Sequence, residues 1–165
     1  MSIDQHSRDT SPNLEFLTFT LGQENYGVDI LTVREIRGWE KIRELHDTPV
    51  FVKGVLDLRG SIVPIIDLRI RFNVDNYEYN ATTVIIVLAI EDGGGMMGVV
   101  VDSVSDVLSV NPADIKKTPS LGSKINTDYV RGMITVDENM VMLVETGKLL
   151  DTETFDVLSK LEGVA

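Results

Sequence analysis

The sequence contains no cysteine and only two histidines in 165 residues. The absence of cysteine excludes disulfides, cysteine metal sites and a cysteine nucleophile. His6 lies in the polar tail and His46 lies beside Asp47, so a two-histidine site would need another ligand from elsewhere, and we expect no metal site. No Gly-x-Ser-x-Gly, His-Glu-x-x-His or Walker motif occurs. We therefore expect a protein that is not an enzyme and that uses no cofactor.

Basic residues and long apolar runs are also scarce. The chain has 15 Lys plus Arg against 26 Asp plus Glu, a formal net charge of −11. This balance disfavours binding to nucleic acid or to anionic membranes, because both depend on positive charge. The longest apolar run, Val84 to Ile90, is much shorter than the roughly 20 residues of a membrane helix. We expect a cytoplasmic protein without membrane insertion, whose polar residues 1–13 form a disordered tail rather than a signal peptide.

Alanine, the best helix former, occurs only four times, against 21 Val and 14 Ile. Branched side chains favour strands, so the composition predicts a mainly β protein. Asp57 and Asp67 are expected on strands, facing solvent. Strands are predicted at Glu15–Leu21, Tyr26–Val28, Arg34–Gly38, Gly54–Leu58, Ile62–Ile66, Thr82–Ile90, Met97–Val101, Val104–Val110, Val130–Val136 and Met140–Val144, with a hairpin turn at Arg59-Gly60.

Two segments have helical features. Asn111-Pro112-Ala113-Asp114 combines an N-cap residue, a proline at the first helical position and an acid in the first turn. Residues 151–165 are predicted to contain an amphipathic helix, because Phe155, Leu158 and Leu161 would form one apolar stripe.

The chain contains an internal repeat. Phe51-Val52-Lys53-Gly54-Val55-Leu56 aligns without a gap on Tyr129-Val130-Arg131-Gly132-Met133-Ile134, at an offset of 78 residues. A second match, at an offset of 71, places Gly27, Val33 and Ile36 on Gly98, Val104 and Val107, and Glu35 on Asp106. Two repeat units, residues 15–80 and 81–146, are therefore predicted. Each is long enough for five short strands, the size of a small SH3-like or OB-like barrel. The repeat does not determine whether strands are exchanged between the two barrels.

Charge is unevenly distributed between the units. Residues 34–71 hold eight basic and six acidic residues, a net of +2, while the rest of the chain carries −13. This asymmetry is consistent with a basic surface for an acidic partner or with ordinary solvated charges.

Several ordered motifs resemble one family. They are Phe16-Leu17-Thr18-Phe19-Thr20-Leu21-Gly22, Tyr26-Gly27-Val28-Asp29-Ile30, Val33-Arg34-Glu35-Ile36-Arg37, Gly54-Val55-Leu56-Asp57-Leu58-Arg59-Gly60, Val63-Pro64-Ile65-Ile66-Asp67-Leu68-Arg69 and Gly98-Val99-Val100-Val101-Asp102. Together they resemble the CheW family of bacterial chemotaxis coupling proteins, over residues 14–150. The resemblance implies two five-stranded β-barrel subdomains and a non-enzymatic adaptor. Such an adaptor links the cytoplasmic tips of methyl-accepting chemoreceptors to the regulatory domain of the CheA histidine kinase in membrane-associated arrays. Further copies of the adaptor would join in rings.

The resemblance also implies candidate receptor- and kinase-binding residues. These are Val33, Glu35, Gly54, Arg59, Gly98 and Gly132, to which our hypothesis of an apolar groove adds Ile36 and Val55. Val33, Ile36 and Val55 are expected to line an apolar groove, with Arg59 and Glu35 at its rim. The glycines also fit a purely structural role, and Val33 fits the core as well as a contact.

The sequence favours three alternative functions less strongly. A CheW-type coupler could serve a kinase pathway unrelated to motility. An OB-type barrel could bind single-stranded nucleic acid through stacking aromatic side chains. Within the basic stretch 34–71, however, Trp39 is the only aromatic residue before Phe51, and the negative net charge of the chain opposes such binding. A small-molecule enzyme lacks any catalytic cluster.

Overall fold

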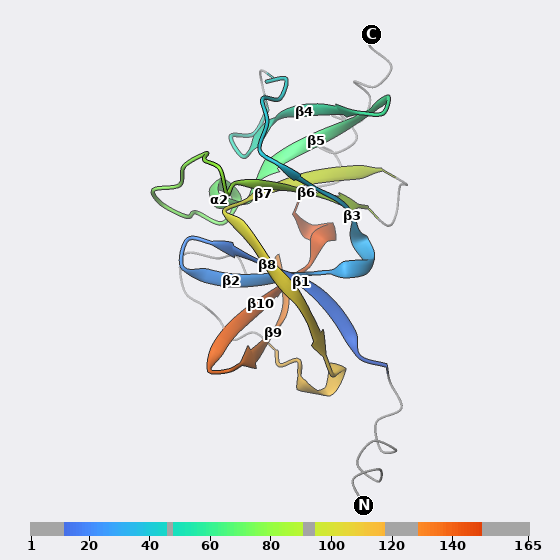
Figure 1. The fold of residues 1–165 in the computed structure, drawn as a ribbon, viewed down its shortest axis with the longest axis vertical. Coiled ribbons are helices and arrows are strands. Elements are labelled where there is room, and N and C mark those ends of the chain that lie inside the picture. Colours follow the sequence, from blue (N-terminus) through green and yellow to red (C-terminus); the bar gives the residue numbers. More distant parts are fainter. Residues whose placement is uncertain (1–11, 46–47, 91–94, 118–128, 150–165) are drawn as a thin grey trace, which may run out of the picture.

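The computed structural model describes residues 12–45, 48–90, 95–117 and 129–149. Within them the chain forms two five-stranded sheets, which lie one above the other in Figure 1. The predicted mainly β fold is confirmed. The first sheet contains β1 (Leu14–Leu21), β2 (Glu24–Asp29), β8 (Ser103–Val110), β9 (Val130–Val136) and β10 (Asn139–Val144). The second contains β3 (Val33–Gly38), β4 (Val52–Leu58), β5 (Ser61–Asp67), β6 (Val84–Ala89) and β7 (Met96–Val101).

The predicted strands are all present, with ends that differ by a few residues. The hairpin at Arg59-Gly60 is also confirmed, because Leu58 pairs directly with Ser61 across a two-residue turn. Both turn residues have positive φ, 53° for Arg59 and 90° for Gly60. Such a turn matches the twist of the two strands that it joins.

The sheets do not coincide with the repeat units. In the first sheet the strand order is β8-β1-β2-β10-β9, so strands from the beginning and the end of the chain are neighbours. The second sheet has the order β3-β6-β7-β5-β4. Each sheet therefore takes strands from both repeat units, which answers the question of strand exchange that the sequence leaves open.

The two sheets are related by the repeat despite this exchange. Replacing β8, β1, β2, β10 and β9 by their repeat equivalents gives β3, β6, β7, β5 and β4, the order of the second sheet. The register agrees as well. Leu143 pairs with Gly27 in the parallel contact of β10 with β2, and Ile65 pairs with Gly98 in that of β5 with β7. The duplication thus specifies two copies of one sheet.

The apolar core has three parts. The largest lies between the sheets and includes Phe19 and Tyr26 of the first sheet with Ile86 and Val99 of the second. A second cluster lies within the second sheet, around Val63 and Ile85, and a third within the first sheet, around Phe16, Val141 and Leu143. Each sheet thus packs against its neighbour and also encloses a core of its own, as a curled sheet does.

Closure of the sheets into barrels stays a prediction. The segment after β3 supports it, because Arg43 and Val55 exchange two backbone hydrogen bonds of 3.1 and 2.8 Å, which brings that segment onto β4. Lys116 and Met133 do the same in the other sheet, with bonds of 2.8 and 2.9 Å.

Helices are few and short in the described ranges. Asn111 caps the 3₁₀ turn η2 (Pro112–Asp114) as predicted, accepting a 2.9 Å hydrogen bond from the amide of Ala113, and the turn ends at Asp114. The helix predicted in residues 151–165 and the tail predicted at 1–13 lie mostly or wholly outside the described residues. None of the helices that are described is long and apolar enough to cross a membrane. The remaining short elements are η1 (Ile30–Thr32), α2 (Leu68–Arg71) and η4 (Thr146–Lys148).

Candidate functional site

Two of the predicted site residues, Glu35 and Arg59, form an ion pair. Glu35 lies on β3, which is an edge strand, and Arg59 lies at the tip of the β4–β5 hairpin. Arg59 Nη1 is 3.3 Å from Glu35 Oε1, although the Arg59 side chain is 78% exposed. The fold therefore brings the two charges together from an edge strand and a hairpin tip, and their role as contact residues stays a prediction.

Arg37 and Glu40 extend this pair into a charged cluster of four residues, Glu35, Arg37, Glu40 and Arg59. Arg37 Nη1 donates to Glu35 at 2.6 Å, and its Nη2 and Nε donate to Glu40 at 2.8 and 3.0 Å. The hydrogen bond from Arg37 is the largest cause of the lowered pKa of Glu35. Desolvation opposes it, and the charges of Arg59 and Arg37 lower the pKa further. Glu35 is therefore a fixed anion between two guanidinium groups.

Arg37 is not among the site residues predicted from the sequence. Side chains two residues apart on a strand lie on the same face, so Arg37 could have been placed beside Glu35 from the strand prediction alone. Glu40 follows the strand end, and its position was not predictable from alternation.

The predicted apolar groove is not formed by the three residues proposed for it. Val55 is only 4% exposed, so it cannot line an open groove, while Ile36 is 47% exposed. Val33 is half-buried and packs against the core between the sheets. Only Ile36 therefore offers a large exposed apolar surface among these three, close in sequence to the charged cluster.

The three predicted glycines are buried and sterically constrained. A Cβ on Gly54, whose φ is +153°, would lie 2.0 Å from the carbonyl oxygen of Arg43. At the repeat-equivalent Gly132 it would lie 2.6 Å from Ile115 Cγ2, and at Gly98 it would lie 2.6 Å from Ile65 Cδ1. These contacts give each glycine a structural role. A direct binding role for them stays a prediction.

The second repeat unit does not reproduce the charged cluster. The positions equivalent to Glu35 and Arg59 are Asp106 and Asp137, two exposed acids. The turn itself is conserved between the units, because Asp137 and Glu138 have positive φ of 49° and 69°. The same backbone therefore presents an ion pair in one sheet and negative charge alone in the other.

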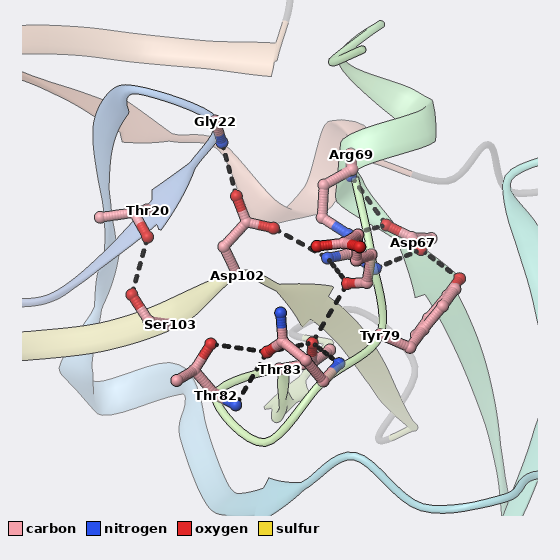
Figure 2. A network of polar contacts seen from close by, with 11 residues as sticks. Thr20, Gly22, Asp67, Arg69, Tyr79, Thr82, Thr83, Asp102 and Ser103 are labelled. Carbon is pink, nitrogen blue, oxygen red and sulfur yellow. Dashed lines mark hydrogen bonds and ion pairs between the residues drawn. The ribbon is translucent and has the colours of Figure 1, made fainter. Parts of the chain in front are cut away.

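A buried polar network lies at the opposite end of β5 from the hairpin tip (Figure 2). Asp67 has no exposed surface, so the expectation that it faces solvent is wrong, whereas Asp57 is exposed as expected. Asp67 is buried because Arg69 donates to it from Nε at 2.7 Å and from Nη2 at 3.1 Å, and the Tyr79 hydroxyl donates at 2.5 Å. Arg69 is fully buried as well, which removes one charge from the basic surface that residues 34–71 were expected to offer.

Comparison with known proteins identifies the family. A family model described as the CheW-like domain matches residues 15–154. The chemotaxis protein CheW of Klebsiella aerogenes is 48% identical over 139 residues, which cover 84% of this chain and 82% of that protein. The chemotaxis protein CheW of Rhizobium meliloti is 34% identical over 144 residues, covering 87% and 92%.

A solved structure agrees with this assignment. The scaffolding protein TtCheW from Thermoanaerobacter tengcongensis superposes with a TM-score of 0.78 at 30% identity, over 87% of this chain and 91% of that one. The family model and both relatives span most of the chain, including the charged cluster and the repeat. The chain therefore belongs to the CheW family of chemotaxis coupling adaptors.

Proposed function

We propose that this chain joins two partners, the regulatory domain of a CheA histidine kinase and the cytoplasmic tips of chemoreceptors, by binding alone and without catalysis. The charged cluster is the observation that carries this proposal. It combines an exposed arginine on a hairpin tip with a fixed carboxylate on an edge strand, while the exposed Ile36 lies on the opposite face of that strand. Paired charges held at a surface in this way are typical of protein interfaces, where they set the orientation of the partner.

The backbone of the hairpin supports a role for Arg59 in contact. A non-glycine residue with φ near +53° is conformationally unfavourable, and asparagine or glycine would fit the turn better. Its exposed position also excludes a role in the core. An arginine that is unfavourable for the turn and unnecessary for packing is best explained by an interaction with another molecule.

The site belongs to a protein recruited to arrays at the cytoplasmic face of the membrane. This part of the proposal rests on the family's role, since receptor tips are found in such arrays. Rings formed with further copies of the chain would extend the assembly, because two similar sheets offer two ends for association.

A pull-down with each partner tests the proposal. The purified chain is mixed separately with kinase regulatory domain and with receptor tip fragments, and we expect it to bind both. Arg59→Glu reverses the charge at the hairpin tip and should weaken at least one contact about tenfold or more, since like charges across an interface repel. Lys148→Glu, the same charge reversal at an exposed position in η4, is the matched control.

Thermal unfolding of the same variants separates binding from stability. An exposed ion pair contributes only about 0–1 kcal/mol, so Arg59→Glu should lower the melting temperature by a few degrees at most. Binding of the unaltered chain to neither partner would contradict the proposed function. A loss of binding that only accompanies unfolding would contradict the assignment of Arg59.

A further inference from the structure

The described chain passes between the two sheets at only two points. The first is η1, which joins β2 of the first sheet to β3 of the second. The second is the single residue Asp102, which lies between β7 of the second sheet and β8 of the first. A one-residue connection is where a small change in backbone angles would reorient one sheet against the other.

Asp102 is held on both sides of this crossing (Figure 2). Its amide donates to the carbonyl of Thr20 at 3.0 Å, and its Oδ2 accepts from the amide of Gly22 at 2.6 Å, which ties it to the first sheet and its β1–β2 turn. Its Oδ1 accepts from Arg69 Nη1 at 2.8 Å, which ties it to α2 at the end of β5 in the second sheet. One carboxylate therefore connects the two sheets at the crossing.

Arg69 is itself rigidly placed. Asp67 binds its Nε and Nη2, and the carbonyl of Glu78 accepts from Nη1 at 3.1 Å. Burial favours the neutral form of Arg69, but its hydrogen bonds to Asp67 and Asp102 outweigh this and raise its pKa above the usual value. The guanidinium group thus remains charged and directed toward Asp102, with its planar donors shared among fixed acceptors.

Among the residues that the structure describes, the first crossing has no equivalent of this arrangement. Asp29 caps η1, but its side chain accepts from the nearby amide of Leu31, and Thr32 donates to the Asp29 carbonyl, so these contacts are local. The repeat equivalent of Arg69 is Gly147. The network therefore belongs to one crossing and is not a general consequence of the duplicated fold.

The apolar core between the sheets does not replace these contacts. Hydrophobic contact opposes separation of the sheets, but it is non-directional, whereas hydrogen bonds to a fixed guanidinium group determine orientation. We propose that Asp102 is a locked hinge and that Arg69 is the positioning residue that locks it, so that the two sheets keep one relative orientation. A rigid body transmits the displacement of one partner to the other, so the use of this rigidity in coupling rests on the proposed function. The existence of the lock does not depend on that function.

Distance measurement by double electron–electron resonance tests the lock. The chain has no cysteine, so Lys41→Cys and Thr135→Cys introduce two unique labels at exposed positions, one beside the second sheet and one on the first. We expect a narrow distance distribution in the otherwise unaltered chain. Asp102→Ala and Arg69→Lys should broaden it about twofold or shift its maximum, because the hinge is released. Asp114→Ala, the loss of an exposed acid on η2, is the matched control and should change nothing.

Hydrogen exchange provides a second reading that separates a local lock from general destabilisation. In Asp102→Ala the amides of Gly22 and of residues 74–83 should exchange about tenfold faster, while amides of β6 and β7 keep their protection. If Asp102→Ala fails to fold, Asp102→Asn, which keeps the shape and one acceptor oxygen, takes its place. An unchanged distance distribution in the folded variant would overturn the lock, as would exchange accelerated equally in every strand. These measurements need no partner, so a chain that binds neither partner but loses its fixed distance would retain the lock and refute the proposed function.

Discussion

At the scale of single residues, the charged cluster adds little to stability, and the role that we propose for it is recognition. Arg59 is mostly exposed, and Glu35 and Arg37 are only partly shielded from water. Ion pairs in such positions contribute little to the free energy of unfolding, since solvent screens them and ordering long side chains costs entropy. What the cluster does provide is a carboxylate and a guanidinium group held in fixed positions at the protein surface.

The ionisation of Glu35 tests this geometry. Its pKa should lie below that of an ordinary glutamate, measured from side-chain carboxyl shifts by NMR during acid titration. Because the folded pKa is lowered, the pairing stabilises the protein above the pKa of the unfolded glutamate, and this stabilisation is lost as the pH falls through the folded value. Arg37→Gln should raise the pKa of Glu35 more than Arg59→Gln does, since the Arg37 hydrogen bond is the largest cause. Equal effects would contradict the arrangement.

Gly54 provides a second test at this scale. Gly54→Ala should lower the free energy of unfolding by roughly 2–3 kcal/mol, because the added Cβ meets the backbone oxygen of Arg43 and the backbone angle disfavours side chains. Gly38→Ala is the control, since nothing lies within 4 Å of the added Cβ there, and its stability should change by less than about 1 kcal/mol. Urea denaturation measures both. Similar losses in the two variants would show that Gly54 is not under the steric constraint described.

At the scale of elements, the β4–β5 hairpin combines a favourable strand pair with an unfavourable turn residue. Asn-Gly is the preferred sequence for a turn with two positive φ angles, and this chain has Arg59-Gly60 instead. The hairpin thus gives up some stability while placing a guanidinium group at its tip.

Arg59→Asn tests whether this exchange serves binding. We expect the variant to be more stable by roughly 0.5–1 kcal/mol, since asparagine tolerates the left-handed region, and to bind at least one partner more weakly. Thermal unfolding and titration calorimetry measure the two effects on one sample. A variant that is less stable, or that binds both partners as well as the original chain, would show that Arg59 is not retained for contact.

Prediction from the sequence succeeded where the determinants are local. The β4–β5 hairpin follows from alternation and a two-residue turn, and the N-cap at Asn111 follows from residue type. The environment of Asp67 could not be predicted in this way. Its burial depends on Arg69, which α2 folds back onto it, and on Tyr79 from the following loop. Although Arg69 is only two residues from Asp67, the contact with Tyr79, 12 residues away, depends on the tertiary fold, as does the contact of Glu35 with Arg59.

At the scale of the whole molecule, the exchange of strands makes the two repeat units interdependent. Neither unit contains all five strands of a sheet, and the core between the sheets uses side chains from both. The sequence repeat is equally compatible with two independent barrels, so this interdependence is visible only in the structure.

Fragment complementation tests it. Residues 1–80 and 81–165, expressed separately, should lack stable tertiary structure, because each lacks strands that the other supplies. When mixed in equal amounts they should assemble and recover the near-ultraviolet circular dichroism of the intact chain. A fragment that folds cooperatively by itself would contradict the observed topology.

Reconstitution with receptor and kinase tests whether this adaptor couples the two through the charged cluster. Autophosphorylation of the CheA kinase is measured with receptor membranes in the presence of the unaltered chain, Arg59→Glu or Lys148→Glu. We expect receptor-dependent kinase activity with the unaltered chain and with Lys148→Glu. Arg59→Glu should reduce this activity about tenfold or more, because a contact of the coupling interface is lost. Kinase activity that is the same with and without the unaltered chain, or that Arg59→Glu leaves intact, would contradict coupling through the charged cluster.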